Sequence, residues 1–183
     1  ENGKLKYCGL ATETVKRYLS RGGASPSSID FTKQDKVLGD EYAVLLSGMI
    51  TDIDGYEIGN IDIRNDFIIC MKYRILRDTG SFLYPNFHLK NERGEYVFVT
   101  SSHTKFLKKS TKGIFEAKCI IPGNLLNNGT FFVGLALGHS DKATYDSFWQ
   151  KDILSFSIID PINETLKEGI RVGYGGAYPG SFR

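Results

Sequence analysis

The chain is 183 residues long, with 41% hydrophobic and 24% charged residues, and this length favours one well-buried domain with extensions over two ordinary domains. Its 23 basic and 21 acidic residues are spread along the sequence and give a net charge of +2. This balance lacks the basic excess of nucleic-acid-binding proteins, so no nucleic-acid partner is expected. Cys8, Cys70 and Cys119 form no C-x-x-C pair, which favours free thiols over a disulfide framework or a zinc site.

Residues 1–20 differ in character from the rest of the chain. Residues 3–9 alternate like a short strand, and residues 12–19 have helical spacing with Thr12 as a plausible N-cap. Residues 21–28 then carry Gly, Ser and Pro with little apolar content, which is typical of a linker. We therefore predict an αβ segment at 1–20, a linker at 21–41 and one domain at 42–183.

From Tyr42 onward, apolar residues recur with a period close to two, as in half-buried strands. Glycine follows Asp54, Arg93 and Asn128, where hairpin turns need positive φ. This spacing predicts an all-β fold, an immunoglobulin-like antiparallel β-sandwich. The expected strands are residues 43–51, 66–76, 86–91, 96–101, 113–121, 131–139 and 153–159.

The alternation also assigns faces. In the second strand it places a row of apolar side chains in the core: Phe67, Ile69, Met71, Tyr73 and Ile75. In residues 129–137 the odd positions are large and apolar, while Gly134 and Ala136 leave the other face nearly bare. A bare sheet face beside aromatic side chains suits a sugar better than a deep catalytic pocket does. If the strands share one sheet, a single polar surface is formed by Lys72, Arg74, His88, Lys90 and Glu116.

An aromatic, acid-bearing loop is predicted just before the last strand. Tyr145, Asp146, Trp149 and Gln150 supply flat apolar rings together with hydrogen-bonding groups, the combination that pyranose recognition requires. The side chain of Trp149 has two other possible places, the core or a dimer contact. The basic residues of the polar surface would suit an acidic sugar or a phosphate cap.

Motifs for catalysis are weak. Asp52 with Asp54, and Asp146 with Asp152, are the sequence-local carboxylate pairs considered for a glycosidase, and the first pair leads into a Gly turn that it is expected to shape. No G-x-S-x-G motif and no G-x-x-x-x-G-K-[ST] phosphate loop occurs. No catalytic residue and no metal ligand is therefore expected.

The order of the motifs is similar to that of a known family. GKLKYCG (3–9) followed by VKRY (15–18) resembles the last strand and helix of an ABC-transporter ATPase domain. The remainder resembles the C-terminal domain of Wzt, the ATPase subunit of O-antigen polysaccharide exporters. The matching segments are YPNFHL (84–89), ERGEYVF (92–98), IPGNLL (121–126), GTF (129–131) and Tyr145-Asp146 leading to DILSF (152–156).

This resemblance implies a carbohydrate-binding domain that recognises a completed O-polysaccharide at the cytoplasmic face of the inner membrane and hands it to the exporter. It implies a homodimer, in which residues 172–178 could form an exchanged strand, and a transmembrane exporter subunit as partner. ATP and Mg would belong to the full-length subunit, and this chain would need no cofactor. The ligand-binding residues predicted from the alternation and the side-chain chemistry above are Arg74, His88, Lys90, Glu116, Tyr145, Asp146, Trp149 and Gln150.

Two other classes of function stay open from the sequence. The sandwich could be a structural module that only dimerises or positions the ATPases, without binding glycan. It could also be a glycosidase-like enzyme, for which the carboxylate pairs above would be required.

Overall fold

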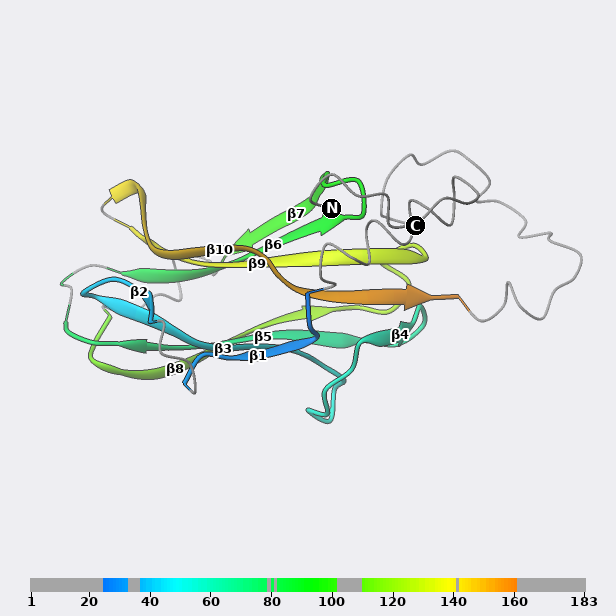
Figure 1. The fold of residues 1–183 in the computed structure, drawn as a ribbon, viewed down its shortest axis with the longest axis horizontal. Coiled ribbons are helices and arrows are strands. Elements are labelled where there is room, and N and C mark those ends of the chain that lie inside the picture. The colour runs from blue at the N-terminus through cyan, green and yellow to red at the C-terminus, as the bar shows by residue number, and fades with distance from the viewer. Residues whose placement is uncertain are drawn as a thin grey trace, which may run out of the picture.

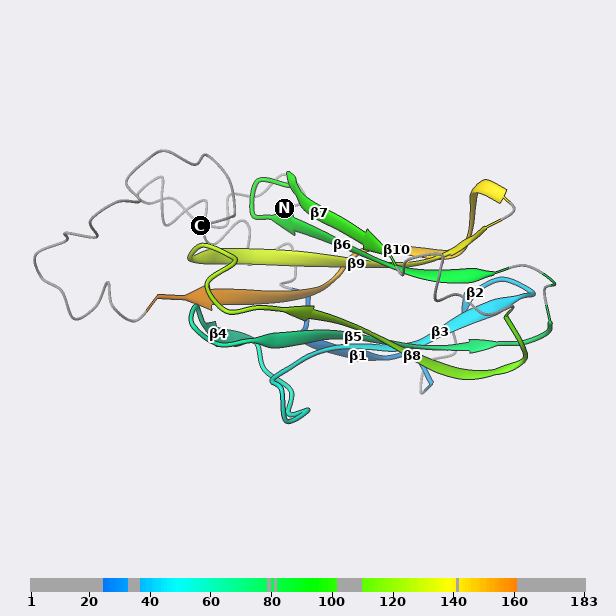
Figure 2. The same ribbon diagram turned by 180° about the vertical axis from the view of Figure 1, so that it is seen from behind.

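The computed structural model describes residues 25–32, 37–78, 80, 82–101, 110–140 and 142–160. In this part the fold is all-β, with two sheets facing each other as a sandwich (Figures 1 and 2), which confirms the predicted class. Within it no helix has the length and apolar character needed to cross a membrane. The predicted ATPase remnant at 1–20 and the predicted exchanged strand at 172–178 lie outside the described residues.

The first sheet, which we call sheet A, has the strand order β1-β3-β5-β8. The short strand β2 pairs with the beginning of β3, and β1 pairs with its second half. Its members β1 and β2 lie within the range predicted as a linker. Their few residues show no period-two pattern, so their strand conformation depends on hydrogen bonding to β3. The bounds are β1 (Ser28–Asp30), β2 (Leu38–Gly39), β3 (Ala43–Thr51), β5 (Phe67–Ile75) and β8 (Gly113–Ile121).

The second sheet, sheet B, has the order β4-β10-β9-β6-β7, with β4 parallel to β10 and the other pairs antiparallel. Strand β10 begins at Lys142, so the predicted aromatic loop is strand. Register shifts along its pairing with β9 interrupt the period and explain why only its second half was predicted. The bounds are β4 (Asn60–Asp62), β6 (Leu83–Asn91), β7 (Tyr96–Ser101), β9 (Gly129–His139) and β10 (Lys142–Ile159).

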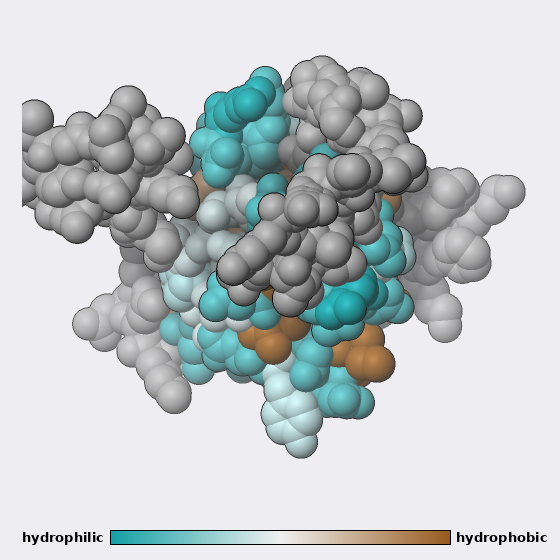
Figure 3. Space-filling view, turned by 90° about the vertical axis from the view of Figure 1, so that its right-hand side faces the viewer, coloured by the Kyte–Doolittle hydropathy of each residue, from teal (hydrophilic) through white to brown (hydrophobic). Residues whose placement is uncertain are grey.

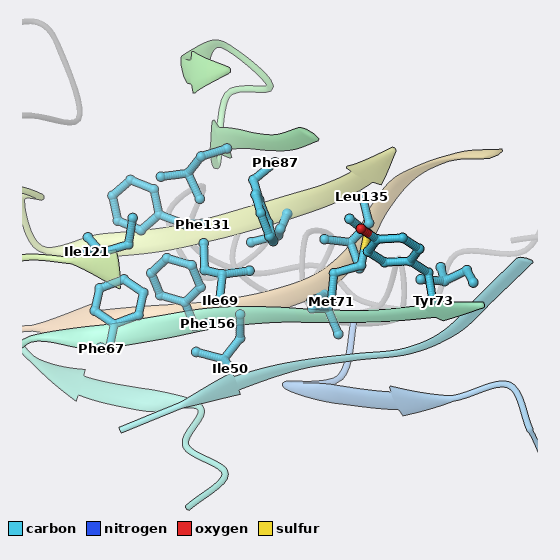
Figure 4. Packing of buried hydrophobic residues seen from close by; sticks show 14 of the residues in the cluster. Ile50, Phe67, Ile69, Met71, Tyr73, Phe87, Ile121, Phe131, Leu135 and Phe156 are labelled. Carbon is cyan, nitrogen blue, oxygen red and sulfur yellow. The ribbon is translucent and has the colours of Figure 1, made fainter. Parts of the chain in front are cut away.

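The core lies between the sheets (Figure 4). The apolar row predicted on β5 is buried, as are the odd positions of β9. At one end Phe156 of β10 meets Phe67 edge-on, with ring centroids 4.8 Å apart, and stacks on Phe131 at 5.5 Å. Leu135 of β9 is fully buried against Gly48 of β3, where an added Cβ would lie 2.7 Å from its Cδ1 atom. A side chain at position 48 would therefore collide with Leu135 of the opposite sheet.

The hairpin between β3 and β4 projects from the sheet A side. The Asp52 carboxylate accepts hydrogen bonds from the backbone N–H groups of Asp54, at 3.0 Å, and of Tyr56, at 2.8 Å. Asp52 thus shapes the turn, as expected from its place before Gly55. Ile53 and Tyr56 are exposed beside it, and Figure 3 shows apolar side chains reaching the surface at this end of the sandwich.

Candidate functional site

The predicted single polar surface is divided between the two sheets. β5 and β8 belong to sheet A and β6 belongs to sheet B. Arg74 and Glu116 therefore lie on the outer face of sheet A, and His88 and Lys90 lie on the outer face of sheet B, on the opposite side of the sandwich. The prediction that these residues form one site is wrong, because alternation within a strand does not reveal which sheet the strand joins.

On sheet A, the two predicted residues have polar and apolar neighbours of their own sheet. Glu116 lies opposite Lys72 in the β5–β8 register and forms a 3.5 Å ion pair with Lys118. Arg74 lies opposite Ile114 on one side and Val44 on the other, and it is exposed. Neither residue belongs to the aromatic surface described below.

The outer face of sheet B has an almost bare central strand. Gly134, Ala136 and Gly138 of β9 face outward there, alternating with buried apolar residues. A Cβ added to Gly134 would lie 3.3 Å from the Cβ of His88 and 3.2 Å from the carbonyl oxygen of Gln150. At Gly138 the ring of Tyr84 covers the backbone, with ring atoms 2.7 Å from where a Cβ would be. Small residues thus let neighbouring rings lie flat against the sheet.

Trp149 occupies this face from β10. It pairs with Ala136 and is 43% exposed, while the preceding Phe148 is buried in the core. Its ring lies 5.6 Å from that of His88, between centroids, with the planes tilted by 33°. The ammonium of Lys151 lies 4.5 Å from the Trp149 ring centroid, within cation–π range. The open alternative that Trp149 is a core residue is therefore excluded.

The row of rings continues toward the edge of the sheet. Tyr96 of β7 is 51% exposed and meets His88 edge-on at 6.0 Å. Lys90, which follows His88 outward on β6, places its ammonium 5.0 Å from the Tyr96 ring centroid. The same ammonium forms an ion pair with Asp152 of β10, at 3.1 Å, so it reaches across the bare strand β9.

Asp152 owes its position to a bulge. The register between β9 and β10 shifts between Gln150 and Leu154, and Asp152 has φ of 50°, in the left-handed region. The hydroxyl of Ser25 donates a hydrogen bond to its carbonyl oxygen. Bulges and left-handed non-glycine residues are concentrated at binding sites, because they redirect a side chain that a regular strand would place elsewhere.

These contacts join rings and charges into one surface beside Gly134, which we call the Gly134 platform. It offers aromatic planes, an ammonium held by a carboxylate and a second, less constrained ammonium. Its members are His88, Lys90, Tyr96, Trp149, Lys151 and Asp152.

His88 lies at the centre of the platform. Its Nδ1 atom is buried and has no hydrogen-bond partner among the described residues. Burial lowers the pKa of His88 below 6.5, the Lys90 charge lowers it further, and the Asp146 carboxylate opposes the shift. The imidazole is therefore neutral at pH 7, and Nδ1 is a polar atom whose hydrogen-bonding capacity is unused.

We expect acidification to destabilise the wild-type protein more than a His88→Gln variant. The unfolded chain takes up the proton near pH 6.5, whereas folded His88 takes it up only at lower pH, so the unfolded state binds more protons between these values. The difference in free energy of unfolding should be constant above about pH 7 and shift against the wild type as pH falls below about 6.5. Urea unfolding across this range measures it, and a pH-independent difference would contradict the lowered pKa.

The other residues predicted for the aromatic loop have different places. Asp146 pairs with Gly138 on the outer face and is near enough to act on the pKa of His88. Gln150 pairs with the inward-facing Leu135, so it lies on the other side of β10 from Trp149. The side chain of Tyr145 is outside the described part of the chain. Of the residues predicted to bind, the structure thus brings together His88, Lys90, Asp146 and Trp149.

Sequence reasoning missed three members of the platform, Tyr96, Lys151 and Asp152, and also Tyr84, whose ring covers Gly138 on the same face. The alternation that places His88 outward on the predicted strand 86–91 would also have placed Tyr84 outward, had the strand been extended to its start at Leu83. Lys151 and Asp152 carry no periodic signal, because they form the bulge itself.

The sequence was compared with models of known protein families. The sequence profile of the Wzt C-terminal domain matches residues 36–171, more than half of the chain. The chain belongs to the Wzt C-terminal domain family. This confirms the resemblance of the sandwich to that domain and associates the chain with the O-antigen ABC exporter, in which this domain is a non-catalytic module of the transporter ATPase.

A solved structure agrees with the fold. The crystal structure of the C-terminal domain of Wzt superposes with a TM-score of 0.56, covering 74% of this chain and 82% of that chain at 13% sequence identity. At this identity the likeness concerns the fold alone. A search of curated protein sequences found no match to this chain.

Proposed function

We propose that this Wzt C-terminal domain binds a completed O-antigen polysaccharide, at its repeat unit or terminal cap, on the Gly134 platform and performs no chemistry on it. The observation that carries the proposal is the unbroken series of contacts from Lys151 through Trp149, His88 and Tyr96 to Lys90, beside a strand that has no side chain at Gly134.

This surface matches the chemistry of a sugar. The apolar side of a pyranose stacks on aromatic rings, and its hydroxyls hydrogen-bond with charged and imidazole groups at the ring edge. Lys151 and the Lys90–Asp152 pair provide such groups at both ends of the row. The two ammonium groups also favour an anionic sugar or cap. Because sugars retain much of their hydration, affinity for one site should be modest.

The proposed location and partners of the domain follow from its family. The domain would act at the cytoplasmic face of the inner membrane, peripheral to it through the exporter complex, and its partners would be the polysaccharide, a second copy and the transmembrane exporter subunit. ATP and Mg would be bound by the ATPase domain of the full-length subunit. Binding here would couple a finished chain to export.

Trp149 is the only tryptophan of the chain, so its fluorescence reports on the platform directly. We expect lipid-free O-polysaccharide from the source strain to change its emission saturably, and polysaccharide of an unrelated strain to leave it unchanged. Calorimetric titration of the same samples should give heat with the cognate polymer only. If neither signal appears at millimolar sugar, the platform is not a glycan site.

The competing function is a structural one, in which the domain dimerises without binding glycan. Among the described strands β8 lies at an edge of sheet A, with Ile114 and Ile120 exposed on it, and a strand edge can pair with another chain. Concentration-dependent dimerisation with no glycan response would support this alternative, and release of reducing sugar would instead indicate an enzyme.

A further inference from the structure

The first described residues of the chain, 25–27, cross from one sheet to the other beside the bulge of β10, and we call them the entry segment. In Figure 1 this segment runs between β10 of sheet B and β1 of sheet A. On the sheet B side, the backbone N–H of Ser155 donates a hydrogen bond of 3.1 Å to the carbonyl oxygen of Pro26. The Ser155 hydroxyl donates a second one to the carbonyl oxygen of Ser25. The entry segment is therefore hydrogen-bonded to β10 next to the bulge that carries Asp152.

The other half of the entry segment is fixed to sheet A. The backbone N–H of Ile50 on β3 donates a hydrogen bond of 2.8 Å to the carbonyl oxygen of Ser27. The Ser27 hydroxyl donates to the Glu57 carboxylate at 2.5 Å, and this hydrogen bond lowers the pKa of Glu57. Because both ends are held, the segment has one defined course past the bulge.

Asp152 lies where β10 is least supported by its own sheet. The register with β9 breaks between Gln150 and Leu154, so Asp152 has no paired residue on that strand. Its φ of 50° is a left-handed conformation, which a non-glycine residue adopts only where surrounding contacts hold it. The Ser25 hydroxyl supplies such a contact, because it donates a hydrogen bond to the Asp152 carbonyl oxygen. The entry segment therefore holds the residue that the β9–β10 pairing leaves unpaired.

The side chain of Asp152 faces the Gly134 platform. Both carboxylate oxygens approach the Lys90 ammonium, at 3.1 and 3.3 Å, and this ammonium lies 5.0 Å from the Tyr96 ring centroid. The Lys90 side chain is 15% exposed and that of Asp152 is 46% exposed. The carboxylate is therefore the more accessible member of the pair, and it offers a bound sugar strong hydrogen-bond acceptors. One residue thus connects the entry segment, through its carbonyl oxygen, with the platform, through its carboxylate.

We infer that Ser25 and Ser155 are positioning residues of the Gly134 platform, which hold Asp152 in the conformation that directs its carboxylate to Lys90. The inference rests on the proposed function for its ligand, the polysaccharide. By linkage, docking of the entry segment strengthens polysaccharide binding, and polysaccharide stabilises the docked segment by the same factor. Occupation of the platform is thereby transmitted to residues 25–27, through which the sandwich is joined to the preceding part of the chain.

Removing the two hydroxyl groups tests the positioning role. Ser25→Ala and Ser155→Ala should each weaken binding of the cognate O-polysaccharide by about threefold to tenfold in calorimetry, the size expected for one lost hydrogen bond. Ser27→Ala is the matched control, because its hydroxyl lies in the same segment but donates to Glu57 rather than to the bulge. It should bind polysaccharide like the wild type.

A double-variant cycle distinguishes positioning from a general loss of stability. Asp152→Asn keeps a residue type that tolerates the left-handed conformation but removes the charge that pairs with Lys90. If Ser25 acts through this carboxylate, Ser25→Ala should cause no further loss of affinity in the Asp152→Asn background. An equal loss in both backgrounds would show that Ser25 supports only the fold and would overturn the inference.

Amide hydrogen exchange measured by NMR tests the same contacts without ligand. The Ser155 N–H reports on the entry segment through its hydrogen bond to Pro26, and Lys90→Met should speed its exchange about threefold or more, because the bulge loses its ion pair. The Ile50 N–H, which is bonded to Ser27, is the internal control and should not change. Polysaccharide should slow Ser155 exchange in the wild type.

Two further results would overturn the inference: wild-type affinity in Ser25→Ala, or Ser155 exchange that does not respond to Lys90→Met. Failure of the proposed function gives a different pattern. If the wild type binds no polysaccharide, glycan binding on the platform is rejected. The exchange response of Ser155 to Lys90→Met then still decides whether the entry segment and the Lys90–Asp152 pair are coupled.

Discussion

Replacing Trp149 by alanine is expected to weaken O-polysaccharide binding by about tenfold to a hundredfold, or about 1–3 kcal/mol. Trp149 offers the largest exposed aromatic plane on the Gly134 platform, and Gly134 and Ala136 leave room beside it. The variant removes both the stacking surface and the ring that contacts His88. Calorimetric titration with the cognate polymer measures the loss.

The matched control is Tyr56→Ala. Tyr56 is more exposed than Trp149 but lies on the hairpin that projects from sheet A, on the other side of the sandwich. It should bind polysaccharide like the wild type. Retained affinity in Trp149→Ala, or an equal loss in Tyr56→Ala, would place the glycan somewhere other than the Gly134 platform.

Leu135→Ala should lower the free energy of unfolding by about 2–5 kcal/mol. Leu135 is fully buried under the bare face of β9, and truncation leaves a cavity between the sheets. Chemical denaturation followed by circular dichroism measures the change. Val99→Ala is the control, because Val99 is 54% exposed on β7 and its truncation should cost less than about 0.5 kcal/mol.

The effects of substitutions at Leu135 and Gly48 on stability are expected to be coupled, because the two residues are in contact. A methyl group at Gly48 would lie 2.7 Å from the Leu135 Cδ1 atom, so Gly48→Ala alone should overpack the core and cost about 1–3 kcal/mol. In the Leu135→Ala background the added methyl enters the space that was vacated. The double variant should therefore be more stable than the sum of the single effects by at least about 0.5 kcal/mol. Strict additivity would show that the two residues are not in contact.

Period-two alternation predicted the fold class and most strands well. The expected strands 43–51, 96–101 and 113–121 have the observed bounds, and the inward row of β5 is buried as expected. These features succeed because side-chain direction in a strand is a local property. Where the local pattern breaks, as in the bulged first half of β10, the prediction of a loop was wrong.

Residue chemistry was predicted more reliably than residue proximity. His88 and Lys90 were predicted to point outward and do so, and Trp149, for which a core position had been left open, lies beside His88 on the outer face of sheet B. Arg74 and Glu116 were chosen by the same reasoning and lie on sheet A instead. Both assignments followed from alternation, but only the order of strands in space separates them.

The sequence alone determined the all-β class, the core side of each regular strand, the bare face of β9 and, through its motif order, the family. The tertiary structure decided which strands share a sheet and brought Tyr96 and Asp152 to His88 and Lys90. The physical reason is that alternation and turn chemistry act over a few residues. Sheet membership depends instead on pairing between strands far apart in the chain.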